Sequence, residues 1–280
     1  MPDGSELINV ARYPLDQDGP ERTRLVSQVR ADLDRDGCAV LRGFLTAAGV
    51  AAIRAETDAV ADRGHRSYSR TNAYFTAPDP SLPPDDPRSR FFDRSNSFIS
   101  ADNFGHGGAL RAAHDFEGFD PFIRECLQQQ LFYRYADPLA DVIVNMAEAG
   151  PGFPWHFDTN AFTVTLAIQN ADQGGAFEYA ANIRSADDEN LDGVRDVLDG
   201  ASDGVVSLDL QPGDLQLFKG RYSLHRVAPL AGPTPRYVAI FSYVDQPDMV
   251  GTPERARQLY GKALPIHYER AGLRADTLLD

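Results

Sequence analysis

Residues 206–218 contain two short apolar runs on either side of a turn, and they read Val206-Ser207-Leu208-Asp209-Leu210-Gln211-Pro212-Gly213-Asp214-Leu215-Gln216-Leu217-Phe218. Apolar side chains at every second position of the first run predict a strand with one buried face. The Pro212-Gly213 pair predicts a tight turn, because both residues interrupt a strand. The whole segment therefore predicts two strands joined by a short turn.

The same pattern of short apolar runs continues on both sides of this segment. Short runs rich in β-branched and aromatic residues, separated by Gly and Pro, predict further strands at 142–145, 162–166, 177–179 and 237–244. Many short strands with tight turns are typical of a sandwich or jelly roll. We therefore predict an α+β fold whose core is a double-stranded β-helix, that is, a cupin-like jelly roll.

The N-terminal part has a different pattern. Leu25, Val29 and Leu33 recur at helical spacing, residues 38–41 predict a strand, and Thr46 is placed to cap a second helix. Residues 66–108 look irregular and rich in arginine and aromatic residues, with a proline-rich stretch at 77–87, so we expect a mobile lid loop. A further helix is expected at 122–127, and the acidic insertion at 187–199 predicts a solvated helix.

Length and composition favour one domain of 280 residues with helical additions. We divide it into a helical N-terminal part with the lid loop (1–131), the jelly-roll core (132–245) and a C-terminal extension (246–280). The net charge of −14 argues against nucleic-acid or membrane partners and favours a small-molecule partner that is polar or cationic. Two cysteines, no run of about 18 apolar residues and no signal-like start predict a cytoplasmic protein.

Three residues predict a metal site. On an extended chain, His156 and Asp158 face the same side, so both can offer a ligand atom to one ion. His225 follows the strand–turn–strand unit and is the natural third ligand. Two histidines and one carboxylate on one face of a metal are typical of non-haem iron(II) oxygenases. A His-x-Asp triplet alone would be weak support, because histidines commonly complete ordinary hydrogen-bond networks.

Arg236 strengthens this interpretation. It follows His225 across the proline-rich turn at 229–235, so a hairpin would bring it beside the strand that carries His225. A guanidinium inside a barrel is costly unless it meets an anion, and a carboxylate is the expected partner. A lone arginine after a hairpin is more often a surface ion pair; the joint occurrence of all four residues favours a site for a keto diacid.

The order His156-x-Asp158, His225, Arg236 on a predicted jelly roll resembles the iron(II)/2-oxoglutarate-dependent dioxygenases over about residues 132–244. Four stretches resemble, within that superfamily, the hydroxylases and halogenases of free amino acids: 155–158, 174–179, 182–190 and 220–227. The resemblance implies iron(II) bound by His156, Asp158 and His225, 2-oxoglutarate held by Arg236, and O2 as the oxidant. Halogenating members replace the carboxylate of the triplet with a small residue, whereas Asp158 is present here. Hydroxylation of an unactivated C–H bond is therefore expected.

Other outcomes stay open at this stage. Desaturation or oxidative cyclisation would use the same cofactors, and a cupin-type metalloenzyme or a binding protein would have no need of 2-oxoglutarate. A free amino acid would need a partner for its carboxylate and acceptors for its ammonium group. The candidates for the first are Arg90, Arg94, Asn96 and Ser97, and those for the second are Asp141, Glu148 and Asn160. Each of these residues is individually more often a solvated polar side chain.

Overall fold

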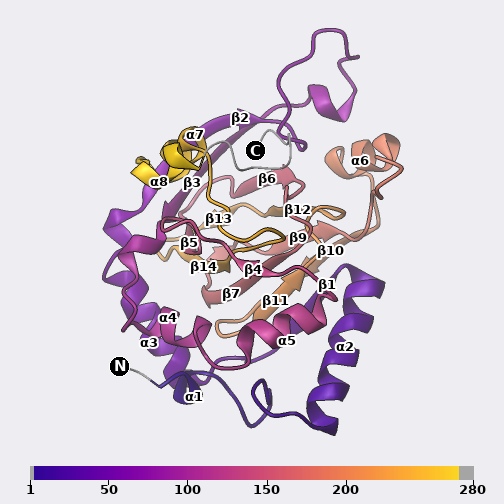
Figure 1. The fold of residues 1–280 in the computed structure, drawn as a ribbon. Coiled ribbons are helices and arrows are strands. Elements are labelled where there is room, and N and C mark those ends of the chain that lie inside the picture. The colour runs from indigo at the N-terminus through magenta and orange to yellow at the C-terminus, as the bar shows by residue number, and fades with distance from the viewer. Residues whose placement is uncertain (1–2, 271–280) are drawn as a thin grey trace.

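The computed structural model describes residues 3–270, so Met1, Pro2 and the last ten residues of the predicted C-terminal extension lie outside the described residues. Two facing antiparallel sheets form the centre of the molecule, and helices cover one of them (Figure 1). The predicted α+β double-stranded β-helix is thus confirmed. No helix within residues 3–270 is long and apolar enough to cross a membrane.

The larger sheet has seven strands. In spatial order they are β1 (Cys38–Leu41), β11 (Leu215–Phe218), β7 (Thr163–Gln169), β14 (Arg236–Phe241), β5 (Val142–Ala147), β3 (Phe92–Ile99) and β2 (His65–Thr71). The smaller sheet has four strands, in the order β10 (Val205–Leu208), β9 (Phe177–Ala180), β12 (Leu224–Val227) and β6 (Phe153–His156). Two short pairs complete the strands: β13 (Leu230–Ala231) with β8 (Gln173–Gly174), and β15 (Tyr243–Val244) with β4 (Tyr133–Arg134).

Helices pack mainly on the outer face of the larger sheet (Figure 1). The N-terminal ones are α1 (Gly4–Leu7), α2 (Pro20–Asp36), α3 (Ala47–Asp58), α4 (Ala109–His114) and α5 (Phe119–Cys126). The later helices are α6 (Leu191–Leu198), α7 (Pro253–Tyr260) and α8 (Pro265–Glu269). Short 3-10 turns lie in the N-terminal part, at Ala61–Arg63, Pro87–Ser89 and Ala101–Asn103. As expected, Thr46 caps α3, since its hydroxyl accepts a hydrogen bond from the Gly49 amide at 3.0 Å.

Alternation along β14 shows how the two faces of the larger sheet differ. Tyr237, Ala239 and Phe241 belong to the main hydrophobic core beneath the helices. Arg236, Val238 and Ile240 point the other way and line a cavity between the sheets. This period of two is what a pleated strand imposes, and it separates the side chains that stabilise the fold from those that form the site.

The expectation of an irregular segment at 66–108 is wrong at both ends of the proline-rich loop, where residues 66–71 and 92–99 form strands. β2 and β3 pair with each other over seven residue pairs, from His65 with Phe98 to Thr71 with Phe92, and β3 continues the sheet by pairing with β5. The polar residues of these strands hid the pattern, because Arg94 and Asn96 occupy the face of β3 that turns toward the cavity. Residues 72–91, between the strands, remain a loop apart from one 3-10 turn.

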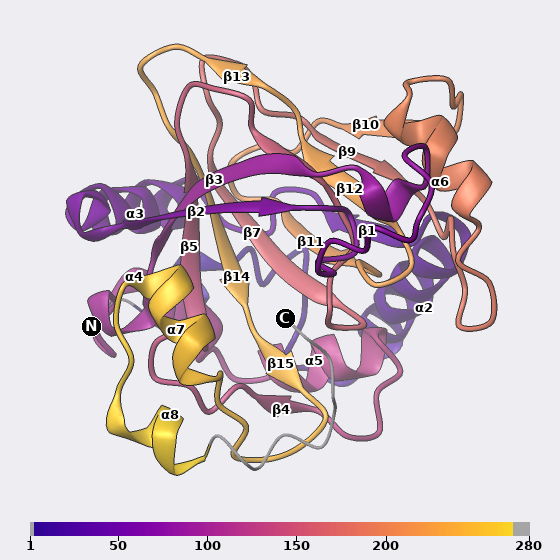
Figure 2. The ribbon, with the colours of Figure 1, turned by 90° about the horizontal axis from the view of Figure 1, so that it is seen from above.

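The C-terminal extension forms part of the cavity wall. α7 packs against β2 and β3 (Figure 2), and Ala256, Leu259 and Tyr260 from this helix face the cavity. Residues 246–270 therefore contribute directly to the cavity, although none of the predicted site residues lies in this extension.

Candidate metal and cosubstrate site

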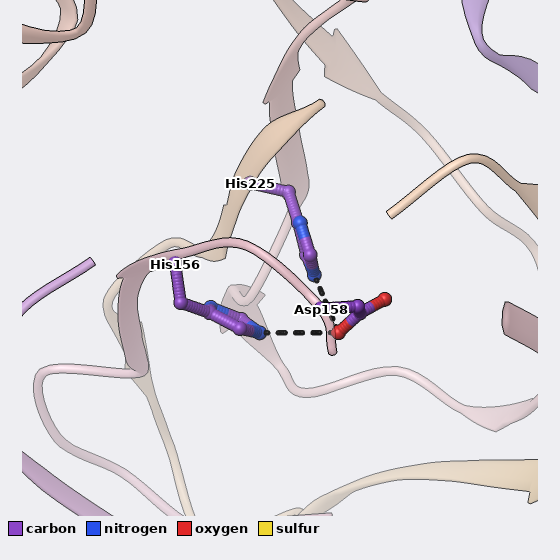
Figure 3. Close-up of side chains that lie close together, drawn as sticks. All are labelled: His156, Asp158 and His225. Atoms are coloured by element: carbon purple, nitrogen blue, oxygen red, sulfur yellow. Dashed lines mark ion pairs between the residues drawn. The ribbon is translucent and has the colours of Figure 1, made fainter. Parts of the chain in front are cut away.

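Strand pairing brings the two predicted histidine ligands together. His225 on β12 lies directly opposite His156 on β6, and their ring centroids are 4.1 Å apart. Asp158 follows β6 by two residues, and its Oδ1 atom lies 3.8 Å from His156 Nε2 and 3.4 Å from His225 Nε2. The three side chains converge on one point (Figure 3), and their ligand atoms all lie within 4.8 Å of one another.

Hydrogen bonds orient both imidazole rings for coordination. His156 Nδ1 lies 2.8 Å from the carbonyl oxygen of Pro154, and His225 Nδ1 lies 3.0 Å from that of Ser223. A carbonyl can only accept, so each Nδ1 carries the proton and each Nε2 presents its lone pair to the shared point. Burial, together with the neighbouring His225, holds the pKa of His156 well below its usual range. The ring is therefore neutral, which is the form that binds a metal.

Asp158 is held as a carboxylate. Burial acts to raise its pKa, but His225, His156 and a hydrogen bond from the Thr163 hydroxyl hold the pKa well below its usual range. The Thr163 hydroxyl donates to Oδ2 at 2.5 Å, which leaves Oδ1 facing the histidines. Two neutral imidazoles and one carboxylate suit iron(II), so the residues present fit the metal that this fold family uses.

Gly220 makes room for this carboxylate. Its carbonyl accepts a hydrogen bond from the Asp158 amide at 3.0 Å, and a Cβ atom at position 220 would lie 1.9 Å from Asp158 Oδ2. Any side chain at position 220 would therefore force the Asp158 carboxylate to move. Glycine is thus required beside the carboxylate, a constraint that sequence reasoning missed.

Arg236, the first residue of β14, is buried and lines the same cavity as the histidines. Burial lowers its pKa to about 10, so the guanidinium stays charged at neutral pH. Within residues 3–270 its side chain makes no ion pair or hydrogen bond. A buried cation without a protein anion fits a ligand carboxylate, as 2-oxoglutarate would provide.

The cavity that joins these groups has a volume of about 310 Å³. Its lining includes two of the predicted substrate-binding residues on β3, Arg94 and Asn96, which are both buried and face the same side. The Arg94 guanidinium lies 4.2 Å from the Phe153 ring centroid and 5.0 Å from that of Phe75, and it has no ion pair among the described residues. Burial and the nearby Arg255 lower the pKa of Arg94 to about 9.

The remaining predicted substrate residues are placed differently. Arg90 forms an ion pair with Asp199 outside the cavity, and Ser97 does not line it, because it alternates with Asn96 along β3. Asn160 lines the cavity wall but is exposed. Two of the candidate ammonium acceptors are engaged elsewhere, since Asp141 pairs with Arg111 and Glu148 with Arg66.

Sequence reasoning missed the far wall of the cavity. Asp137, Arg255, Leu259 and Tyr260 all contribute to it. Thr252 caps α7 and Pro253 occupies its first position, a helix-start signal that could have located this helix.

Comparisons with known proteins agree with this fold. The family model described as Halogenase D matches residues 21–259, whereas no curated protein matches the chain. The nogalamycin-biosynthesis epimerase SnoN, described as non-heme and alpha ketoglutarate dependent, is similar in structure. Its TM-score is 0.52 at 13% identity over 80% of this chain and 82% of SnoN.

Two further solved structures are similar at comparable levels. A prolyl hydroxylase from Trichoplax adhaerens gives a TM-score of 0.51 at 16% identity, covering 82% of this chain and 95% of that one. EctD from S. alaskensis, solved with 2-oxoglutarate and 5-hydroxyectoine, gives 0.50 at 19% identity, covering 78% and 75%. At these sequence identities the structural likeness shows a shared fold and does not by itself assign an activity to this chain.

Proposed function

We propose that this chain, which belongs to the Halogenase D family and to the iron(II)/2-oxoglutarate-dependent oxygenases, hydroxylates an unactivated C–H bond of a free amino acid or a similar small polar metabolite. The observation that carries the proposal is the complete set of two histidines and Asp158 in one cavity with the unpaired Arg236. The cofactors are iron(II) and 2-oxoglutarate, with O2 as the oxidant.

In this proposal His156, Asp158 and His225 hold the iron, and Arg236 holds the distal carboxylate of 2-oxoglutarate. When bound, these groups supply the oxidising power: O2 and 2-oxoglutarate convert a C–H bond to C–OH, with succinate and CO2 as the other products. The chain supplies orientation. The carbonyls of Pro154 and Ser223 fix the imidazole rings, the Thr163 hydroxyl fixes the carboxylate, and the rings of Phe153 and Phe177 beside the histidines limit the access of water.

Arg94 and Asn96 are the proposed partners of the amino-acid substrate. The buried guanidinium of Arg94 suits the substrate carboxylate. The sequence also predicts Asn96 as a partner of this carboxylate, but the Asn96 Oδ1 atom is buried without a donor among the described residues. An orphaned acceptor in the cavity wall suits the ammonium group instead. Two residues apart on one face of β3, they match the two charges of a zwitterion.

Halogenation is the alternative that the family description raises. Asp158 opposes it, because its carboxylate would take a coordination position that a halide needs, and its charge disfavours a second anion. Desaturation and oxidative cyclisation share the cofactors and differ in how the substrate is placed. A metalloenzyme or binding protein that does not use 2-oxoglutarate would leave the buried charge of Arg236 without a function.

A cytoplasmic location is part of the same proposal. Cys38 and Cys126 are both free and buried, as expected for a reducing compartment. The net charge of −14 supports a small-molecule partner rather than a nucleic acid or an anionic membrane.

The deciding experiment is to incubate the iron-loaded protein with 2-oxoglutarate, chloride, 18O-labelled dioxygen and each common amino acid in turn. Succinate should form with the substrate, and mass spectrometry should show one added labelled oxygen. Loss of two hydrogens would identify desaturation or cyclisation. A chlorinated main product, or no succinate with any amino acid, would contradict the proposal.

A further inference from the structure

The cavity has one end that neither the iron nor the cosubstrate explains. Phe98, Ala140, Ile143, Ala256, Leu259 and Tyr260 line it, and all six belong to one hydrophobic cluster between β3, β5 and α7. These side chains present apolar surface to the cavity. A ligand group that contacts this end gains free energy by leaving water if it is apolar.

The order of residues along β3 points a substrate toward this end. Arg94, Asn96 and Phe98 face the cavity in sequence, and alternate residues on a strand lie about 6.6 Å apart. With the substrate carboxylate at Arg94 and its ammonium group at Asn96, as in the proposed function, the next position along the strand is Phe98. The substrate side chain therefore extends toward the apolar cluster.

The carboxylates of the cavity wall are already engaged. Those that line the cavity among residues 3–270 are Asp158 and Asp137. Asp158 belongs to the proposed iron site. Asp137 is 1% exposed and accepts hydrogen bonds from the amides of Leu139 at 2.8 Å and Gly251 at 2.9 Å.

His267 on α8 completes the partners of Asp137. Its Nδ1 accepts from the Leu264 amide at 2.7 Å, so its Nε2 carries a proton and donates to Asp137, with both oxygens at 3.1 Å. These three donors bond both oxygens of Asp137 within the protein and leave roughly one of its acceptor sites free. The other charged side chains of the lining are the arginines Arg94, Arg236 and Arg255. The two histidines of the lining belong to the proposed iron site. A second ammonium group on a substrate would thus be buried among three arginines, and the one carboxylate outside the iron site already accepts from three protein donors.

We infer that the substrate side chain is uncharged and aliphatic, and that the cavity discriminates against amino acids with cationic side chains such as lysine. This inference rests on the proposed function and specifies its substrate. Leu259 of α7 is the residue that we expect to determine this specificity, because it is buried in the apolar end and lies within the described cavity lining.

L-Norleucine and L-lysine form a matched pair for the test, since lysine adds one ammonium group to the same four-carbon side chain. Binding is measured without oxygen, by calorimetry and by the fluorescence of the chain's single tryptophan, Trp155, which adjoins His156. The protein carries iron(II) and 2-oxoglutarate. Norleucine should bind at least tenfold more tightly than lysine, because the lysine ammonium group loses its hydration near three arginines and finds no carboxylate free of protein donors.

Leu259→Glu adds a carboxylate to the apolar end of the cavity and should reverse the preference, with a gain of at least tenfold for lysine relative to norleucine. Gln258→Glu places the same charge on the exposed side of α7 and should change neither affinity by more than about twofold. Thermal unfolding and 2-oxoglutarate affinity show whether each variant is intact. The wild-type comparison decides the matter even if Leu259→Glu does not fold.

The outcomes separate the inference from the proposed function. Tighter binding of lysine than of norleucine to the wild-type protein would overturn the inference alone. If neither amino acid binds while 2-oxoglutarate does, the amino-acid substrate itself is wrong and both proposals fail.

Discussion

His156 and His225 lie directly opposite each other on neighbouring antiparallel strands, with ring centroids 4.1 Å apart, although they are distant in the sequence. A register shift of one residue would turn one of the two rings to the other face of the sheet. The geometry of the proposed iron site is therefore a property of the pairing between β6 and β12, and Asp158 joins it from the loop that follows β6.

We expect His225→Ala to lose tight iron binding and turnover, because the remaining two ligands cannot hold the ion on three sides. Metal analysis after dialysis and succinate formation are the measurements. Iron content and activity equal to those of the wild-type protein would show that His225 is not a ligand.

Gly220→Ala tests the same site without removing a ligand. The new Cβ would lie 1.9 Å from Asp158 Oδ2, so the carboxylate must move and iron affinity should fall by at least tenfold. Gly105→Ala is the matched control, because no atom lies within 4 Å of a Cβ there. Equal iron affinities in the two variants would contradict the placement of Asp158.

Arg236→Lys keeps the positive charge but loses the planar fork that matches a carboxylate. The apparent Michaelis constant for 2-oxoglutarate should rise at least tenfold, while iron binding in the absence of 2-oxoglutarate should be unchanged. An unaltered 2-oxoglutarate requirement would mean that another residue holds the distal carboxylate.

Asn72→Ala should destabilise the loop at 72–91. The buried Asn72 side chain accepts from the amides of Tyr74 and Thr76, and its amide donates to the Thr76 hydroxyl and the Arg88 carbonyl. Losing this set should cost about 2–4 kcal/mol of local stability. Limited proteolysis should then cut between 72 and 91 faster than in the wild-type protein, and substrate should slow the cutting if the loop is a lid. Cutting at equal rates would show that Asn72 does not hold the loop.

The two cysteines make the protein sensitive to alkaline pH. Burial raises the pKa of the Cys38 thiol to about 11 and that of Cys126 to about 12. Each native thiol holds its proton more tightly than in the unfolded chain. The contribution of the thiols to the free energy of unfolding is therefore fully present below about pH 9 and decreases as the pH rises toward 11 or 12. Urea unfolding between pH 8 and 11 measures the decrease. It should be smaller in Cys38→Ala, and an equal decrease in that variant would contradict a contribution from this thiol.

Local patterns predicted much of the fold. The strand at 38–41 has the predicted bounds, Thr46 caps α3 as expected, and the run at 215–218 is β11. These elements bury a regular apolar face, so their periodicity is visible in the sequence. β2 and β3 were missed because their inner face carries Arg94 and Asn96 toward the cavity rather than toward a hydrophobic core.

The candidate site shows the same division. The order of His156, Asp158, His225 and Arg236 in the sequence was informative because hairpins return these residues to one place. Partners such as Asp137 and His267 were not foreseeable, since each is an ordinary residue until the chain buries them together. The constraint at Gly220 likewise arises from a contact between distant segments, which no local pattern encodes.

The central position of β14 has a consequence for synthesis of the chain. β14 joins β7 on one side to β5 on the other, so the two halves of the larger sheet share no strand until about residue 241 has left the ribosome. Until then each half presents an unpaired edge that can associate with other chains. Ribosome-bound chains that end before Arg236 should accordingly stay sensitive to protease and depend on chaperones, and native-like resistance should appear only once β14 has emerged.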